Sequence, residues 1–265
     1  MENNYIILGP WQVAAAAALI LINILLSIAL KLKLEKQLGI ASIRMVLQLL
    51  LVGFILEWIF TLENFIWILG MALLMASVAS ISAVNRTRRK FSAIYWNSFF
   101  SIISASFLIT GIALSGIIQV DPWYHPQYLI PVLGMVLGNT LNGISLTLDR
   151  FMEDLSSRRN QIESLLALGA TRWEAAHESM KESARAGMIP TINSMMVMGI
   201  VSLPGMMTGQ ILAGANPMNA IYYQIMILFV IAAASALGII VVILLTFRSL
   251  FNSRHQLAIH RLHLK

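Results

Sequence analysis

The sequence predicts an all-α, polytopic integral membrane protein with about seven transmembrane helices, and three observations support this fold class. The chain of 265 residues is 58% hydrophobic and 11% charged, whereas soluble domains average about 25% charged residues. Runs of about twenty apolar residues, the length needed to cross the hydrocarbon core, recur along the chain. Segments of alternating hydrophobicity typical of a membrane β-barrel are not seen, so helices are expected to satisfy the backbone polar groups in lipid.

The apolar runs delimit the predicted spans and leave one membrane domain, residues 1–265. The first run is not expected to be a cleavable signal peptide, because its leader carries Glu2 and no basic residue, and the run is too long. No appended soluble domain is predicted. In chain order the runs are Trp11–Leu30, Ala41–Phe60, Asn64–Val84, Ser92–Ile118, Gln127–Leu148, Met188–Leu212 and Pro217–Phe247.

The basic residues predict the orientation of these spans. With seven spans, the loops alternate between Lys/Arg-rich and Lys/Arg-free, and all eighteen Lys and Arg residues fall on one face. Acidic residues such as Glu2, Glu63 and Asp121 occupy the opposite face. The positive-inside rule then places the N-terminus outside and the C-terminus inside a cell (inner or plasma) membrane. The net charge of +6 reflects this topology, and nucleic-acid binding is not expected.

One long polar segment, residues 150–187, interrupts the hydrophobic chain, and we call it the elbow. It contains twelve of the thirty charged residues of the protein. The segment is interpreted as a cytoplasmic helical elbow that docks another protein. An amphipathic helix lying on the membrane surface is the alternative. The mixed signs of its charges favour docking, because surface-bound helices usually carry a basic polar face.

The elbow is predicted to contain two helices joined by a tight corner. The first, about Arg150–Leu168, is expected to continue the fifth span. Gly169 is placed to end it, since glycine adopts the left-handed conformation at little cost. Thr171 and Glu174 have the spacing of a capping box, which predicts a second helix extending to about Arg185.

The sixth apolar run contains the dipeptide Pro204-Gly205, which predicts a break in the helix. Carbonyl groups freed by such a break need partners or a water-lined cavity. Broken spans are frequent at substrate sites of transporters, so this segment is a candidate pathway. A kink that serves only packing is the alternative, and any single methionine is more simply explained as apolar filler. The polar and sulfur-bearing side chains beside the break are Met206, Met207, Thr208 and Gln210.

The fifth span carries a G-x-x-x-G pattern, Gly134 and Gly138, typical of a close approach between two helices. Asn139 and Asn142 beside it are polar groups in lipid that need partners. Contact between helices is favoured over substrate contact for these two, although both are candidates for a pathway. Glu57, near the outer end of the second span, is a further pathway candidate, with simple access to the interface as its alternative.

The absence of several catalytic motifs excludes the classes of enzyme that depend on them. The sequence has no P-loop, no H-E-x-x-H pattern and no serine nucleophile elbow. It has no cysteine, so thiolate metal sites and disulfides are impossible. The chain is therefore not predicted to be an enzyme, and any ATP that drives it must be hydrolysed by another subunit.

Four strings of residues together resemble the FetB-type family of ABC transporter permeases, which includes bacterial iron-export permeases and plant aluminium-tolerance permeases. The resemblance covers most of the chain, from the second span to the seventh. The last string is the most specific. The strings are Arg44-x-x-x-Gln48-Leu with Val52-Gly53, Gly134-Met-x-x-Gly138-Asn139, Glu163-x-x-x-Ala167-Leu-Gly169-Ala170, and Leu203-Pro-Gly-Met-Met-Thr-Gly-Gln210.

This resemblance implies a partner, a cargo and a role for the elbow. The partner would be a cytoplasmic ABC ATPase subunit that holds ATP and Mg, with no cofactor bound directly by this chain and two copies of each subunit. The cargo would be a metal ion, iron above others, moved outward; its ligands are left unassigned. The implied ATPase-coupling residues are Glu163, Ala167, Gly169, Ala170, Thr171 and Trp173.

The elbow differs from the coupling loop of bacterial ABC importers, which it resembles in the spacing of Glu163 and Gly169. Ser164 and Leu165 replace two alanines of that loop, and Pro190 comes too late. A different ABC subtype is therefore expected. Three other functions compete with metal export: an ABC permease for a sugar nucleotide or lipid, a membrane scaffold that transports nothing, and a secondary transporter. The last predicts inverted repeats and central acidic residues, which the sequence lacks.

Overall fold

The computed structural model describes residues 9–62, 64–252, 256–258 and 262–264, and over these ranges the chain is almost entirely helical. The helices are α1 (Pro10–Ala29), α2 (Glu35–Leu62), α3 (Phe65–Asn85), α4 (Ile94–Ile112) with a π-helical extension η1 (Ala113–Ile118), α5 (Pro126–Ser157), α6 (Arg159–Ala167), α7 (Arg172–Val197), α8 (Gly205–Leu212) and α9 (Pro217–Leu250). Two short strands, β1 (Arg89–Lys90) and β2 (His263–Leu264), pair antiparallel.

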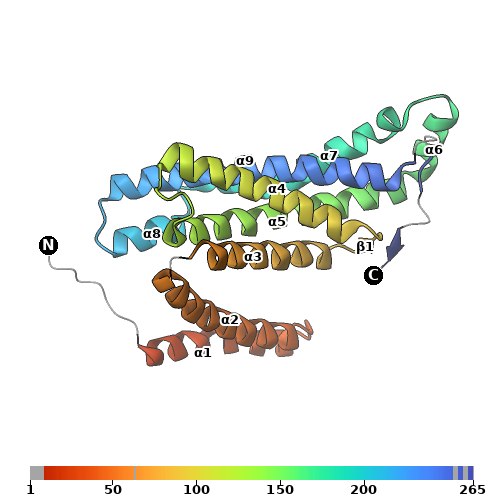
Figure 1. Cartoon of the computed structure of the whole chain (residues 1–265). Coiled ribbons are helices and arrows are strands. Elements are labelled where there is room, and N and C mark those ends of the chain that lie inside the picture. The colour runs from red at the N-terminus through yellow and green to blue at the C-terminus, as the bar shows by residue number, and fades with distance from the viewer. Residues whose placement is uncertain (1–8, 63, 253–255, 259–261, 265) are drawn as a thin grey trace.

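Helix α5 is the centre of a bundle in which the long helices run side by side (Figure 1). It packs against α3, α4, α7 and α9, whereas α1 and α2 contact mainly each other and lie along one side of the bundle. The turn between α1 and α2 is fixed by the buried hydroxyl of Ser27. This hydroxyl donates a hydrogen bond of 2.9 Å to the Glu35 carboxylate and accepts one of 3.0 Å from the Leu34 amide.

Six of the described helices are long and apolar enough to cross a membrane, namely α1, α2, α3, α4 with η1, α5 and α9. These six coincide with six of the seven predicted spans, and the protein is a multi-pass membrane protein. The remaining prediction, a span over Met188–Leu212, is not one helix: α7 ends at Val197 and α8 begins at Gly205. The eight residues of α8 extend only about 12 Å, less than half of the hydrocarbon core.

The charged connections gather at one end of the molecule. In Figure 1 the α1–α2 turn, β1 and the elbow helix α6 all lie at the right-hand end, and α8 lies at the opposite end. This arrangement agrees with the alternation of Lys/Arg-rich loops, and the positive-inside rule predicts that the elbow end faces the cytoplasm.

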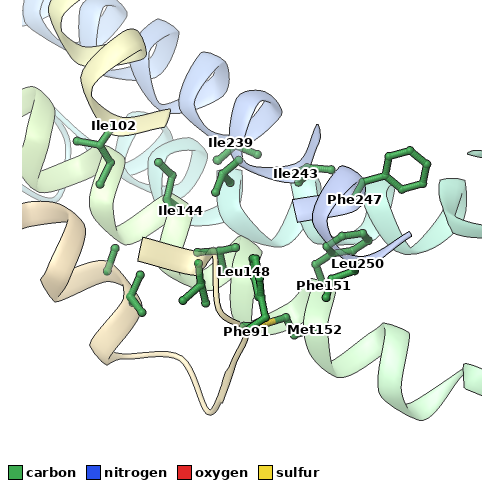
Figure 2. Packing of buried hydrophobic residues seen from close by; sticks show 14 of the residues in the cluster. Phe91, Ile102, Ile144, Leu148, Phe151, Met152, Ile239, Ile243, Phe247 and Leu250 are labelled. Carbon is green, nitrogen blue, oxygen red and sulfur yellow. The ribbon is translucent and has the colours of Figure 1, made fainter. Parts of the chain in front are cut away.

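The main hydrophobic core lies where α5 and α9 face each other toward the elbow end (Figure 2). On α9 the side chains of Ile239, Ile243 and Phe247 recur every four residues, so they occupy one face of the helix. From α5, Leu148 and Phe151 meet this face, and both are fully or almost fully buried. The elbow is therefore attached to a well-packed part of the bundle.

Helices α5 and α7 approach each other closely at Gly143 and Gly187. A Cβ atom added to Gly187 would lie 2.8 Å from the Gly143 carbonyl oxygen and would overlap the Thr147 hydroxyl. By contrast, a Cβ on Gly134 would meet only the Cε of Met75, at 3.2 Å, and a Cβ on Gly138 would meet nothing within 4 Å. The glycine pair that brings helices together is thus outside the G-x-x-x-G pattern.

Candidate functional site

The first part of the elbow consists of two helices, which corrects the prediction of one helix over Arg150–Leu168. Helix α5 ends at Ser157, Arg158 leaves the helical conformation with φ −96° and ψ 18°, and α6 follows. The side chain of Ile162 is 2% exposed, and Leu166 one turn later packs against the core. Helix α6 is therefore held on the bundle by its apolar face, while its charged face is exposed.

The corner after α6 has the geometry that glycine permits. Gly169 has φ +95°, in the left-handed region that other residues rarely adopt. Its amide donates to the Leu166 carbonyl at 3.1 Å, and the Ala170 amide donates to the Leu165 carbonyl at 3.0 Å. The corner ends α6 as predicted, and Leu168 at its tip is 85% exposed.

Helix α7 begins with the predicted capping box. The Thr171 hydroxyl accepts a hydrogen bond from the Glu174 amide, and the Glu174 carboxylate accepts bonds of 2.8 Å from both the amide and the hydroxyl of Thr171. These hydrogen bonds lower the pKa of Glu174 below its ordinary value of 4.5. The bond from the Thr171 amide has the larger effect, and the bond from the Thr171 hydroxyl has the smaller one. The helix does not stop near Arg185 as predicted, because it continues to Val197 with Pro190 inside it.

Replacing Thr171 by alanine is expected to loosen the start of α7. Loss of an N-cap threonine typically costs about 0.5–2 kcal/mol. The native pKa of Glu174 is lowered, so its contribution to stability is fully present above the ordinary pKa of 4.5 and is lost as the pH falls through the lowered value. Hydrogen exchange of the first α7 amides should accelerate in Thr171→Ala and much less in Thr171→Ser. Equal exchange in all three proteins would contradict this role.

The start of α7 is bound to the end of α9. The Trp173 ring meets the buried Phe247 ring edge-on, with centroids 5.7 Å apart. The Arg172 guanidinium lies 5.6 Å from the same ring and donates a bond of 3.1 Å to the Asn252 carbonyl. Of the other residues with a predicted coupling role, Glu163 forms an exposed ion pair of 2.7 Å with Arg159. The corner is consequently fixed to α9 on one side and exposed on the other.

Beyond the far end of α7 the chain is irregular, as Pro204-Gly205 predicts. Gly199 has φ +87°, and its amide donates a bond of 2.9 Å to the Ser202 carbonyl. Pro204 then caps α8, where the Thr208 hydroxyl donates to the Pro204 carbonyl at 2.9 Å. The break therefore replaces about two turns of the predicted sixth span by a small loop.

A cavity of about 340 Å³ lies beside this loop. It is bounded by α5, the end of α7, the loop, α8 and α9. Seven of its lining residues have polar or sulfur-bearing side chains: Met135, Asn139, Thr191, Ser194, Met198, Met206 and Gln224.

A second cavity, of about 410 Å³, adjoins the first. Both are lined by Met135, Met206 and Ile227, so these side chains form their common wall. The second cavity also receives Gln210 from α8 and Met226 from α9. We refer to the two as the paired cavities.

The paired cavities contain only some of the predicted pathway residues. Asn139, Pro204, Gly205, Met206 and Gln210 line them. Outside their lining are Met207, Thr208, Asn142 and Glu57. Asn142 accepts a hydrogen bond from the Arg86 guanidinium, and Glu57 is exposed on α2.

Sequence reasoning missed Gln224, which is 7% exposed and whose Oε1 has no hydrogen-bond partner. Its Nε2 is 3.9 Å from the Met198 sulfur. One signal was available, since Gln224 is an amide within the long apolar run that forms α9. The contribution of Met135 and Met198 had no comparable signal, because methionine also fills apolar gaps.

Comparison with known proteins gives a consistent result over most of the chain. The profile of the family described as "Uncharacterised protein family (UPF0014)" matches residues 10–251. The "UPF0014 membrane protein slr1647" of Synechocystis sp. is 40% identical over 226 residues, 85% of this chain and 87% of the relative. The "Probable iron export permease protein FetB" of Escherichia coli is 36% identical over 251 residues, 94% and 95% of the two chains.

A plant protein is also similar. "Protein ALUMINUM SENSITIVE 3" of Arabidopsis thaliana is 32% identical over 247 residues, 93% of this chain and 89% of the relative. No solved structure matches the chain significantly.

Proposed function

Because the chain belongs to the UPF0014 family of membrane proteins, we propose that it is the permease subunit of an ATP-driven ABC transporter that exports a metal ion. ATP and Mg would be bound by a separate cytoplasmic ATPase subunit, and two copies of each chain would assemble. The polar elbow would be the surface on which the ATPase docks.

The observation that carries this proposal is the continuity of α7. One helix of 26 residues begins at the exposed corner and ends at the paired cavities. At 1.5 Å per residue such a helix is about 39 Å long, enough to connect a cytoplasmic surface to the interior of the membrane. Movement of the corner by an ATPase would therefore reach the cavity lining through a single element.

The exposed side chains of the elbow support a docking role. Leu168 is 85% exposed, and Trp173 and Leu165 are 47% and 37% exposed. They lie among charged residues of both signs at the polar end of the bundle. An apolar centre with a charged rim is typical of protein interfaces.

The proposed cargo rests on the sequence similarity to a relative whose name states a cargo. The Escherichia coli relative is named a probable iron export permease, so iron moved outward is the cargo to test first. The paired cavities support transport over a purely scaffolding role, since a scaffold has no need of a partly polar cavity beside a broken helix.

The test is transport by sealed vesicles that contain this chain and a candidate ABC ATPase subunit from the same organism. Iron is expected to cross the membrane only when ATP is supplied on the side of the elbow. A matched preparation with an ATPase variant that binds but cannot hydrolyse ATP serves as control. Movement of iron that does not depend on ATP, or no association of the ATPase with this chain, would refute the proposal.

A further inference from the structure

We propose that the paired cavities form a metal site in which methionine sulfurs and glutamine amide oxygens are the ligands, and that this site prefers soft cations of low charge, of the Cu(I) and Ag(I) type. The inference rests on the proposal that the cargo is a metal ion, and it departs from iron in the class of ion that it names. It assigns ligands that the sequence left open.

Methionine side chains are prominent in the lining of the paired cavities. Met135, Met198, Met206 and Met226 all line the paired cavities, and Met135 and Met206 form the wall that both share. Thioether sulfur is a soft ligand that selects ions such as Cu(I). Each cavity thus has three methionines in its lining, which offer a coordination chemistry that apolar filling does not require.

The paired cavities are also lined by glutamines whose amide oxygens have no hydrogen-bond partner. Gln224 is 7% exposed, and its Oε1 makes no hydrogen bond, although a buried polar atom of this kind normally has one. The Oε1 of Gln210, which lines the second cavity, is likewise buried without a partner. An ion in the first cavity would supply the partner that the Gln224 oxygen lacks, and an ion in the second would do so for Gln210.

The net charge of the cavity lining limits which ions it can hold. The residues that line the two cavities include no Asp, Glu, Lys or Arg. Across the described part of the chain, no three of His, Cys, Asp and Glu gather in a group that could hold a metal. A neutral site in a medium of low dielectric constant cannot offset the charge of a trivalent ion. By the same reasoning, iron would enter as Fe(II) rather than Fe(III).

The absence of cysteine makes the sulfur ligands directly observable. The full chain, purified in detergent, is titrated with Ag(I) in a chloride-free buffer, and X-ray absorption is recorded on the bound ion. We expect sulfur atoms in the first coordination shell, and in this chain only methionine can provide them. A shell of nitrogen and oxygen alone would overturn the proposal, since it would indicate binding by histidine or amide groups elsewhere.

A pair of conservative variants locates the site. The double variant Met135→Leu/Met206→Leu removes sulfur from the common wall with little change in volume, and its melting temperature verifies the fold. Ag(I) affinity is expected to fall more than tenfold, because even changes outside the first shell cost about 10–100-fold. The matched control is Met45→Leu/Met218→Leu, at positions that are 50% and 52% exposed, and should bind as the wild type does.

Competition with a hard ion tests the preference. Al(III) in excess is expected to leave bound Ag(I) in place. Displacement by Al(III), or equal affinity of the two double variants for Ag(I), would overturn the inference. Because no ATPase is present, failure here leaves ATP-driven transport to be judged on its own, and success would not depend on it.

Discussion

Replacing Gly187 by alanine is expected to destabilise the protein by about 1–3 kcal/mol, the usual range for overpacking a well-packed core. The added methyl group would press on the Gly143 carbonyl, a backbone group that cannot rotate away, and on the Thr147 hydroxyl. Valine at this position should prevent α5 and α7 from packing at all. Thermal unfolding in detergent, followed by tryptophan fluorescence, measures the effect.

The matched control is Gly70→Ala, on α3, where an added Cβ meets nothing within 4 Å. That variant should be as stable as the wild type or slightly more so, since alanine favours the helix by up to about 1 kcal/mol over glycine. Combining Gly187→Ala with Thr147→Ala removes the hydroxyl but not the carbonyl contact, so only part of the stability should return. A Gly187→Ala protein that melts like Gly70→Ala would contradict the close approach of α5 and α7.

Replacing Leu168 by glutamate is expected to weaken binding of the proposed ATPase subunit while leaving the membrane protein folded. The side chain is 85% exposed, so the fold does not depend on it. A buried charge in the centre of an interface should weaken ATPase binding by roughly tenfold or more, as loss of an interface hot spot does. Binding of the purified ATPase and ATP-driven transport in vesicles are the two measurements.

Leu32→Glu provides the control for that change. Leu32 is 53% exposed in the α1–α2 turn, at the same end of the molecule. The two variants introduce the same charge on the same face, so only a contact specific to the elbow can separate them. If both weakened ATPase binding equally, the elbow would have no special role in docking.

The sequence predicts most of this fold because lipid leaves few alternatives. Apolar runs of membrane length become helices: α2, α5 and α9 contain their predicted spans, and α1 and α3 match theirs to within one residue at each end. The corner of the elbow was equally predictable from sequence, because Gly169 favours the end of a helix and the Thr171–Glu174 pair favours the start of one. Six residues of local sequence determine its geometry, with little help from distant parts of the chain.

Features that depend on distant contacts were not predictable in the same way. Nothing local distinguishes Gly143 and Gly187 from other glycines, since their function arises only when α5 and α7 cross. The stop at Arg158 and the extension of α7 to Val197 likewise depend on packing against the bundle rather than on helix propensity. The paired cavities combine side chains from η1, α5, α7, α8, α9 and the loop between α7 and α8, so their composition becomes visible only in three dimensions.

The glycine contact between α5 and α7 also divides α7 into two arms of unequal length. From Thr171 to Gly187 the helix rises about 24 Å, and from Gly187 to Val197 about 15 Å. A rotation of α7 about this contact would therefore move the cavity end opposite to the elbow end and about 0.6 times as far. Pro190, three residues beyond the contact, lacks the amide that would bond to the Ala186 carbonyl, so the shorter arm can bend on its own. Helix α7 would thus pivot at the Gly143–Gly187 contact, and the part of it that reaches the cavities could also bend at Pro190.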